Sequence, residues 1–492
     1  MHIVIQKAKN GEDTALAEGH FLHSNYAPSK EAERFVQNLK LPYTPSSIIL
    51  IEPALSYQAK YLRKYFPGVR VGAIRLCKDF STYDGLFDFV IEAYGYASYE
   101  TLLESKLSEE ELLGAYFLDW QPSAQIFSVE SRMLWQAIKN ALTRAKTLLI
   151  TRQYFEKKWF LNSIRFIKYL HNTVSFDSLI DKDTLIISSG PSLKPFINFI
   201  KENQNSFFII CLSSAISICI KNGIIPDLCM TTDGGYWASQ HLKKLEKTDL
   251  PLAMPAEAYC PPSLLSKLKV LPLSYSDGIS EEVIKSQNIV SKKAVRNGTV
   301  SGTAMLFAAE YCNKNIYMTG LDMAGQKGFQ HTQPNELEAN AAYKDNRLKT
   351  KESRMTAAGL PGGSLEIYRD WFKNFSFNSG NRKLYRLIEE KDRKNSLGQI
   401  EDINLKKFSS LIKKERDKKQ YIHKTETCKN DFSEVIKLLE NPEKLEIWKK
   451  GLFPLDYLSL VHNPSNTEAK EKIEKEWQKL LKKTGDILHD NL

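Results

Sequence analysis

The sequence predicts an α/β chain in three parts: a degenerate Rossmann-like N-terminal module, a central doubly wound domain with a mostly parallel sheet, and a helical C-terminal domain. Two observations lead to this prediction. Short apolar runs alternate with helical patterns up to residue 405, which is typical of parallel strands joined by crossover helices. After residue 405 the chain is rich in lysine, and its apolar residues recur at the spacing of amphipathic helices. Because 492 residues exceed a single hydrophobic core, we expect domains at 1–175, 176–405 and 406–492.

The N-terminal module has the strand–helix–strand order of a small nucleotide-binding unit but lacks its glycines. Its predicted elements are strands 47–52 and 69–76 and helices 57–66 and 131–171. The turn after the first strand reads Ile51-Glu52-Pro53-Ala54-Leu55-Ser56-Tyr57. A dinucleotide-binding turn needs glycine there so that a phosphate can approach the backbone, and the charge of Glu52 would repel that phosphate. We therefore expect no cofactor in this module.

The central domain carries the pattern of a doubly wound sheet. Its predicted strands are 185–188, 207–212, 228–231, 270–273, 288–291 and 316–319, with Lys383–Leu387 as a last piece. Such sheets bind ligands beyond the carboxyl ends of their strands. The segments that follow these strands are therefore the first place to look for a site.

The first central strand runs into the turn Ser189-Gly190-Pro191-Ser192, and a helix is predicted over 193–200. A helix start presents unpaired N–H groups and a partial positive charge, which suits an anion. Gly190 has no Cβ to keep a phosphate from the backbone, and Ser192 can cap the helix. An ordinary capped turn without a ligand is the alternative interpretation.

Polar groups recur at the ends of the other strands. They are Ser213 and Ser214 after the second strand, Asp233 and Gly234 after the third, and the run Asn297-Gly298-Thr299-Val300-Ser301-Gly302-Thr303 at a second helix start. Each one alone is compatible with a simple loop. Four such groups on one sheet edge predict a phosphate or ribose site.

The sixth strand ends in Gly320-Leu321-Asp322, and His331 follows in a glycine-rich stretch. Asp322 falls where α/β sheets place functional carboxylates, and His331 is either an acid–base group or a structural residue. The single Asp-x-Asp, at 181–183, precedes its strand and is expected in a surface turn. We expect no obligatory metal, with Asp227, Asp233 and Asp322 as the carboxylates that could reverse this expectation.

Charge and cysteine usage restrict the class of protein. The formal charge of +10 favours an acidic ligand, but the basic residues are spread along the chain, which does not indicate nucleic acid. No CxxC pair occurs, so reduced thiols in a cytoplasmic protein are expected. Serines interrupt the longest apolar run, at 207–220, and the first residues lack a signal-peptide core, so we expect no membrane span and no export.

Taken in order, several motifs resemble the central domain of the motility accessory factor (Maf) proteins, the bacterial flagellin glycosyltransferases. They are Gly190-Pro191-Ser192-Leu193, Gly223–Asp227 with Thr232-Asp233, Ser301-Gly302-Thr303-Ala304, and Gly320-Leu321-Asp322 with His331. The resemblance covers about residues 176–405. It implies a fold similar to that of bacterial sialyltransferases, a CMP-activated nonulosonic acid (pseudaminic or legionaminic type) as donor, and Ser or Thr of flagellin as acceptor. A related archaeal branch contains pterin pyrophosphokinases.

The resemblance also implies roles for single residues. His331 would be the base of an inverting single displacement, and Asp322 would flank the acceptor with it. Tyr236 and Trp237 would stack on a base or sugar, or pack in the core. The implied nucleotide-sugar site comprises Ser189, Gly190, Pro191, Ser192, Ser213, Asp233, Gly234, Asn297, Gly298, Thr299, Ser301, Gly302, Thr303 and Gly320.

Two further alternatives stay open. One is a 6-hydroxymethylpterin pyrophosphokinase-like enzyme, and the other is a non-catalytic escort that binds flagellin through its helical surfaces. Either the N-terminal module or the C-terminal helices would grip flagellin. The polar segment 349–363 is expected to be a mobile loop of the kind that closes over sites.

Overall fold

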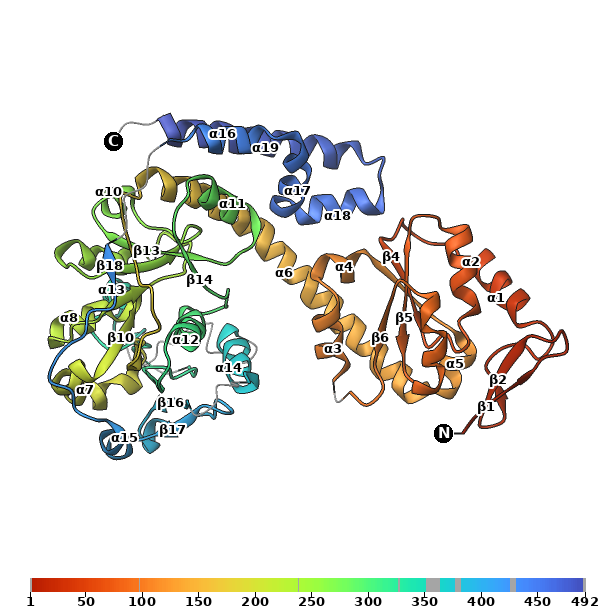
Figure 1. Cartoon of the computed structure of the whole chain (residues 1–492), viewed down its shortest axis with the longest axis horizontal. Helices are drawn as coiled ribbons and strands as arrows, with labels where there is room; N and C mark the ends of the chain where they lie inside the picture. Colours follow the sequence, from red (N-terminus) through yellow and green to blue (C-terminus); the bar gives the residue numbers. More distant parts are fainter. Residues whose placement is uncertain are drawn as a thin grey trace. The chain divides into compact units, whose positions relative to one another are not determined.

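The computed structural model describes residues 2–96, 98–237, 239–325, 328–350, 363–376, 382–424 and 431–489. The chain divides into two compact units, an N-terminal unit of residues 1–156 with 449–479 and a C-terminal unit of residues 157–448 with 480–492. Figure 1 shows the elements of both. The division differs from the three predicted parts, because it falls inside one long helix, and the C-terminal helices are shared between the two units.

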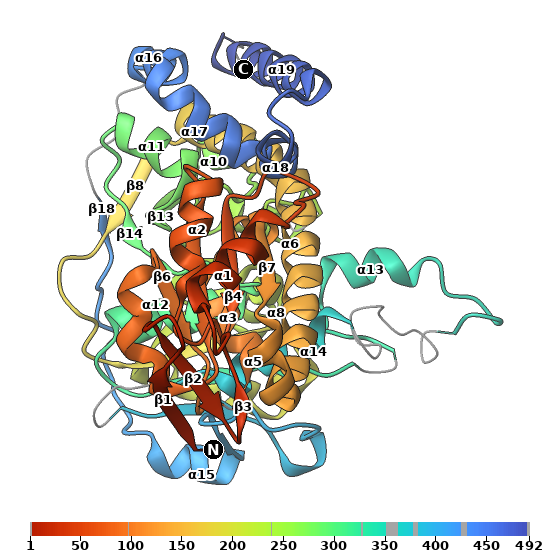
Figure 2. The same cartoon turned by 90° about the vertical axis from the view of Figure 1, so that its right-hand side faces the viewer.

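The N-terminal unit contains a parallel four-stranded sheet in the order β6-β5-β4-β7 and a separate antiparallel sheet in the order β1-β2-β3 (Figure 2). Its elements are β1 (Ile3–Lys7), β2 (Asp13–Ala17), β3 (His20–Phe21), α1 (Pro28–Gln37), β4 (Ser47–Ile51), α2 (Tyr57–Tyr65), β5 (Arg70–Arg75), η1 (Lys78–Leu86), β6 (Phe89–Glu92), α3 (Tyr99–Lys106), α4 (Glu109–Gly114), β7 (Ala115–Asp119), α5 (Gln121–Ile126) and α18 (Pro454–His462). Helix α6 (Ser128–Tyr169) begins in this unit, and α17 (Pro442–Leu452) and α19 (Thr467–His489) belong to it in part.

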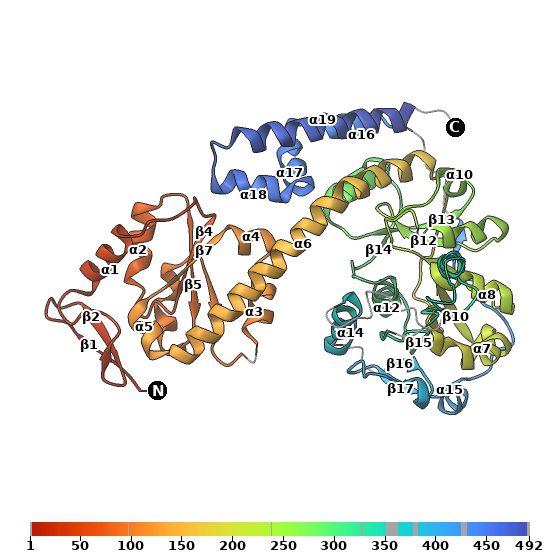
Figure 3. The ribbon, with the colours of Figure 1, turned by 180° about the vertical axis from the view of Figure 1, so that it is seen from behind.

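Helices cover both faces of the four-stranded sheet (Figures 1 and 3). Ile48 and Leu50 of β4 lie in a core with residues of α1 and α2. The alternate residues Ile49 and Ile51 lie in a second core with residues of α3, α4 and α6. A strand buried on both faces reads as a continuous apolar run, which is why the sequence predicts β4 correctly.

The glycine-free turn after β4 is filled by an ion pair. Glu52, Ala54 and Ser56 all have positive φ, at 40°, 47° and 65°. The buried guanidinium of Arg75 donates to Glu52 Oε1 at 3.0 Å, to the Ala54 carbonyl at 2.9 Å and to Ser56 Oγ at 2.7 Å. Protein groups therefore occupy the place at which a dinucleotide-binding turn receives its phosphate.

Residues 449–479 complete the N-terminal unit from a distant part of the sequence. The Thr44 N–H donates to the His462 carbonyl at 3.2 Å, and the Tyr43 and His462 rings lie 4.2 Å apart. Gln153 of α6 contacts both Asp456 and the N–H of Leu455. This unit is therefore discontinuous in sequence.

The C-terminal unit is built on one large sheet. Its elements are β8 (Asn172–Ser175), β9 (Asp183–Ile187), η2 (Pro191–Phe196), α7 (Ile197–Asn203), η3 (Gln204–Ser206), β10 (Phe207–Leu212), η4 (Ser213–Ala215), α8 (Ile216–Asn222), β11 (Leu228–Met230), α9 (Ser239–Leu242), η5 (Lys243–Lys247), β12 (Leu252–Pro255), α10 (Pro262–Leu265), β13 (Lys269–Ser274), α11 (Gly278–Ser286), β14 (Lys292–Lys293), α12 (Val300–Tyr311), β15 (Ile316–Thr319), α13 (Glu336–Ala342), α14 (Ser364–Asn374), β16 (Leu384–Leu387), η8 (Glu390–Asp392), β17 (Glu401–Ile403), α15 (Leu405–Leu411), β18 (His423–Lys424) and α16 (Ser433–Glu440).

The strand order of this sheet is β17-β16-β15-β9-β10-β11-β12-β13-β8-β18, and β14 pairs with β13. All these pairs are parallel except the β8–β18 pair at one edge. From β9 the chain proceeds in one direction through β10 to β13, and it returns to the other side of β9 with β15. The topological switch point, where such sheets bind ligands, therefore lies between β9 and β15.

Both faces of the central sheet are buried. Phe208, Ile210 and Leu212 of β10 belong to one core together with residues of α12. On the other face, Phe207 stacks on Phe408 of α15, with ring centroids 5.7 Å apart. The sequence predicts a doubly wound domain, and this layered sheet confirms that fold class.

Some local predictions differ from the structure. Residues 288–291 form a loop after α11, and the short strand β14 follows it. The helix predicted over 193–200 begins as the 3₁₀ turn η2 and continues as α7, with Pro195 inside the turn. Strand β12 reads Leu-Ala-Met-Pro, a sequence with little β propensity, and the sequence prediction missed it.

No helix among the described residues combines the length and the apolar character needed to cross a bilayer. The predicted mobile loop at 349–363 lies, apart from its ends, outside the described residues.

Candidate active site at the carboxyl edge of the central sheet

The loops that follow β9 and β15 are joined at the switch point. The Gly190 N–H donates to the Gly320 carbonyl at 3.0 Å. Ser192 donates to Asp322 Oδ2 twice, from its N–H at 3.3 Å and from its hydroxyl at 3.0 Å. A Cβ added at Gly190 would overlap Asp322 Oδ2 and the Gly320 carbonyl. Gly190 is thus required for the contact between two protein loops, and the Ser192 hydroxyl bonds Asp322 instead of capping η2.

The carboxyl group of Asp322 is the internal hydrogen-bond acceptor of this turn. Burial raises its pKa, while the hydrogen bonds from Ser192 and the charge of Arg386 partly offset this effect. The buried Arg386 of β16 pairs with Asp402 and donates to the Leu321 carbonyl, and the Asn395 side chain donates to the Asp322 and Met323 carbonyls. The sequence prediction missed this support, although an arginine inside the apolar run Leu384–Leu387 is a signal for it.

The segment from His331 to Glu338 lies across the same edge. The Thr332 N–H donates to the Ser189 carbonyl at 2.6 Å, and its hydroxyl donates to the Gly190 carbonyl at 2.9 Å. The hydroxyls of Ser189 and Ser214 are 2.9 Å apart, and Asn335 reaches the Ser214 carbonyl. The structure therefore brings together the Gly190 turn, the loop with Ser213 and Ser214, and His331.

His331 is held by a carboxylate. Its Nδ1 lies 2.9 Å from Oε1 of Glu338, and its side chain is 40% exposed, against 13% for Glu338. A carboxylate only accepts hydrogen bonds, so it favours the proton on Nδ1 and leaves the Nε2 lone pair available. This is the arrangement expected of a general base.

Asp233 and Gly234 lie on the loop after β11. Asp233 Oδ1 accepts from the Gly235 N–H at 2.6 Å, as in an Asx turn. A Cβ at Gly234 would lie 2.7 Å from the Trp159 ring. Tyr236 and Trp237, on the same loop, are 53% and 68% exposed. These two rings are therefore surface groups and not part of the core.

The second predicted helix start is α12, which has 12 residues. Thr299 is its N-cap and accepts from the Gly302 N–H at 3.0 Å, and Asn297 Oδ1 accepts from the Thr299 N–H at 3.0 Å. Because α12 is the crossover helix before the parallel strand β15, it runs antiparallel to the strands, and its first turn lies at their carboxyl edge. The N–H groups of Val300 and Ser301 have no acceptor within the helix and point toward that edge.

Several predicted glycines and hydroxyls here have structural roles. A Cβ at Gly298 would lie 2.7 Å from the Tyr368 ring, and a Cβ at Gly302 would overlap Asn297. Thr303 donates to the Val295 carbonyl at 3.2 Å. The adjacent Arg296, which the sequence prediction missed, pairs with Glu257 and Asp277 and lies over the Tyr275 ring.

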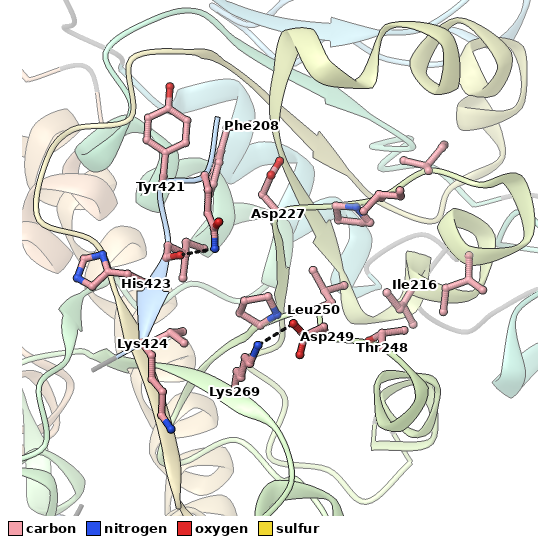
Figure 4. Close-up of a pocket in the computed structure, with 18 of the residues that line it drawn as sticks. Phe208, Ile216, Asp227, Thr248, Asp249, Leu250, Lys269, Tyr421, His423 and Lys424 are labelled. Carbon is pink, nitrogen blue, oxygen red and sulfur yellow. Dashed lines mark hydrogen bonds and ion pairs between the residues drawn. The ribbon is translucent and has the colours of Figure 1, made fainter. Parts of the chain in front are cut away.

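A cavity of about 580 Å³ lies at the opposite, amino edge of the sheet (Figure 4). Its lining includes Asp227, Thr248, Lys269 and Tyr421. Burial raises the pKa of Asp227, an effect that the nearby charge of Lys418 partly offsets. Asp227 is thus at the other edge from Asp233 and Asp322, and the described residues contain no cluster of three or more metal-ligating side chains.

A family model described as 6-hydroxymethylpterin diphosphokinase MptE-like matches residues 154–328. An uncharacterized protein of Treponema pallidum (strain Nichols) is 31% identical to the chain over 266 residues, which are 54% of this chain and 58% of that protein. A second uncharacterized protein of the same organism is 22% identical over 126 residues, 25% of this chain and 60% of that one. The chain thus spans less than two thirds of each relative's length.

A solved structure, that of a Maf glycosyltransferase from Magnetospirillum magneticum AMB-1, is similar to the chain with a TM-score of 0.51 and 13% identity. The similarity covers 99% of this chain and 90% of that one. At this identity it shows the fold. Together with the family model, it confirms the predicted resemblance of the central domain to Maf proteins and to pterin pyrophosphokinases at the level of fold.

Proposed function

We propose that this protein is a glycosyltransferase that moves a nonulosonic acid of the pseudaminic or legionaminic type from its CMP-activated form to Ser or Thr of flagellin, in the cytoplasm, as a step of flagellar assembly and motility. The observation that carries the proposal is His331, a half-exposed histidine whose Nδ1 is held by Glu338 at the switch point. The fold similarity to a Maf glycosyltransferase supports the reaction class. The donor and the acceptor come from the resemblance of the motifs.

The chemistry is one displacement at the anomeric carbon of the donor. His331 Nε2 accepts the proton of the acceptor hydroxyl, whose oxygen forms a bond to that carbon. The bond from the carbon to the phosphate oxygen breaks, and CMP leaves with the electron pair. The configuration at the anomeric carbon is inverted.

The leaving phosphate is best placed at the start of α12. Its first-turn N–H groups and the positive end of the helix dipole stabilise an anion. The equivalent position at η2 holds the carboxylate of Asp322, which acts in this proposal as a clamp for the Gly190 turn. The exposed rings of Tyr236 and Trp237 would stack on the cytosine or the sugar.

The site matches the length of the donor. The strands β15, β9, β10 and β11 are consecutive neighbours, and the loops after them carry Asp322, Gly190, Ser213 and Asp233. Neighbouring strands are about 4.8 Å apart, so this edge spans about 15 Å. That is the scale of an extended nucleotide sugar.

The test is intact-mass analysis of purified flagellin incubated with the protein and a CMP-nonulosonic acid. A mass gain of whole sugar units that His331→Ala abolishes supports the proposal. His423→Ala is the matched control, because His423 is exposed but lies on β18, beside the cavity at the amino edge. A mass gain that persists in His331→Ala contradicts the assignment of His331 as the base. The absence of a mass gain with the wild-type protein contradicts the proposed transferase activity.

A pyrophosphokinase is the second candidate, since the matched family model carries that description. The model's match ends at residue 328, before His331. A pyrophosphokinase built on the matched segment would therefore keep its activity in His331→Ala. Formation of AMP from ATP in the presence of 6-hydroxymethyl-dihydropterin measures it, and co-purification of unmodified flagellin would indicate the escort alternative.

A further inference from the structure

Helix α13 presents two carboxylates in its first turn, and each one bonds Nδ1 of a histidine. Glu338 lies 2.9 Å from His331 Nδ1, and Glu336 lies 2.8 Å from His241 Nδ1. The two histidines differ in accessibility, because the side chain of His331 is 40% exposed and that of His241 is 5% exposed. The glutamate–histidine pair at His331 is therefore open to a ligand, whereas the pair at His241 is a contact inside the protein.

Glu336 fastens α13 to the helices α8 and α9. Its carboxylate accepts from the Ser217 hydroxyl of α8 as well as bonding His241 of α9. Burial tends to raise the pKa of Glu336, but the hydrogen bonds from His241 and Ser217 outweigh it and leave the pKa below its ordinary value. This half-buried carboxylate, with its lowered pKa, is a structural contact.

Glu338 is surrounded by donors from its own loop. Its Oε1 accepts from the Gln330 N–H at 2.6 Å, its Oε2 accepts from the Gln333 side chain at 3.0 Å, and its own N–H donates to Asn335 Oδ1. These bonds fix the carboxylate in one orientation before any ligand arrives. The Glu338 carboxylate faces His331, with Oε1 2.9 Å from Nδ1.

We infer that Glu338 is a positioning residue, which holds the proton of His331 on Nδ1, aims Nε2 at the acceptor hydroxyl and stabilises the imidazolium formed when that hydroxyl loses its proton. The inference rests on the proposed function. It assigns the role to Glu338 and excludes its neighbour Glu336, although both bond a histidine. Glu338 itself touches neither donor nor acceptor.

The first readout is spectroscopic and needs no activity. In the full-length protein with ¹⁵N-labelled histidine, the two-bond ¹H–¹⁵N pattern reports which ring nitrogen carries the proton. For neutral wild-type His331 we expect the Nδ1–H form. Glu338→Gln should shift His331 toward the Nε2–H form, because the amide can donate to Nδ1.

The second readout is kinetic. Glu338→Gln should lower kcat by about 10²- to 10⁴-fold with KM for flagellin nearly unchanged, as expected when a base adopts the wrong tautomer. Glu338→Asp, which keeps the charge, should recover part of the rate and the Nδ1–H form. Glu336→Gln should reduce thermal stability while leaving the His331 tautomer unchanged.

The outcomes separate the inference from the proposed function. If the wild-type protein transfers no sugar, the proposed function fails, and the tautomer result still tests the contact itself. If Glu338→Gln keeps the tautomer, or changes it without loss of kcat, the inference is overturned. If Glu338→Gln does not fold, Glu338→Asp is the deciding variant. The Nδ1–H tautomer with a wild-type kcat would overturn the positioning role, whereas a reduced kcat at unchanged KM would support it.

Discussion

Gly190 and Gly320 allow two loops to close against each other at the switch point. Gly320 has a positive φ of 68°, and a Cβ on it would overlap the Ser188 carbonyl. Gly190 has an ordinary extended conformation, so its requirement comes entirely from the approach of Asp322 and Gly320. The turn is therefore as sensitive to a single methyl group as a well-packed core.

Gly190→Ala should destabilise the C-terminal unit by about 1–3 kcal/mol, because the added methyl must displace Asp322 or the Gly320 carbonyl. Hydrogen exchange of β9 and β15 in the full-length protein measures the change. Gly85→Ala is the control, since nothing lies within 4 Å of its Cβ position. Equal exchange in Gly190→Ala and wild type would show that the loops are not held together as described.

His23 makes the N-terminal unit sensitive to acid. Its Nε2 accepts from the Leu55 N–H at 3.1 Å, and burial lowers its pKa to about 3. At a pH below the ordinary pKa of histidine, this side chain binds a proton in the unfolded chain but not in the folded unit. The free energy of unfolding therefore falls as pH decreases toward the pKa of His23 in the folded unit. Between pH 7 and 5 we expect a loss of about 2 kcal/mol from this residue.

The measurement is hydrogen exchange of β4 at these two pH values, corrected for the intrinsic exchange rate. In His23→Gln this part of the pH dependence should disappear, whereas the exposed control His20→Gln should keep it. A pH dependence that survives in His23→Gln would assign the effect to other groups.

For single residues, the sequence predicts which ones lie together at the carboxyl edge of the central sheet better than it predicts their roles. Ser189, Gly190, Asp322 and His331 do lie together. The sequence predicts that Gly190 makes room for a phosphate, but the carboxyl group of Asp322, from a distant part of the chain, lies there. Contacts between such distant residues cannot be predicted from local pattern.

Among the elements, α12 is the clearest candidate for an anion site because its start is a well-formed cap. Thr299 accepts from the Gly302 N–H, and Asn297 in turn fixes Thr299. The sequence predicts this element correctly, since small and hydroxyl residues before an apolar run are a helix-start signal. It misses β8 and β12, which are short and gain their strand conformation from neighbours in the sheet.

Thr299→Ala should cost about 1 kcal/mol of stability through the lost cap, and Thr299→Ser should restore most of it. The matched experiment compares hydrogen exchange of residues 300–308 in the two variants. We also expect weaker donor binding in Thr299→Ala, since a frayed first turn aims its N–H groups poorly. Equal exchange in both variants would mean that tertiary packing alone defines the start of α12.

Across the whole molecule, connectivity is the feature that the sequence describes least well. The C-terminal helices look like one charged helical domain, and their residues are helical as predicted. However, residues 449–479 belong with the N-terminal unit, through contacts of α18 with α4 and the loop at Thr44. Amphipathic helices indicate that an apolar face is covered, but not which partner covers it.

A chain that ends after Trp448 should lose protection in α4 and β7 by about tenfold or more, because α18 no longer covers them. A chain that ends after Lys479 is the control, since it keeps every residue of the N-terminal unit. Hydrogen exchange of residues 109–119 measures both. Unchanged protection in the shorter chain would show that the N-terminal unit is complete without residues 449–479.

The discontinuity of the N-terminal unit has a consequence for synthesis on the ribosome. Translation adds about 5–20 residues per second, so roughly 15 to 65 s pass between the appearance of Glu156 and that of Lys479. During this time the C-terminal unit can fold nearly to completion, while the first residues synthesised still lack α18. The unit whose translation starts first therefore stays incomplete until nearly the end of synthesis, and a nascent-chain chaperone would have its longest engagement there.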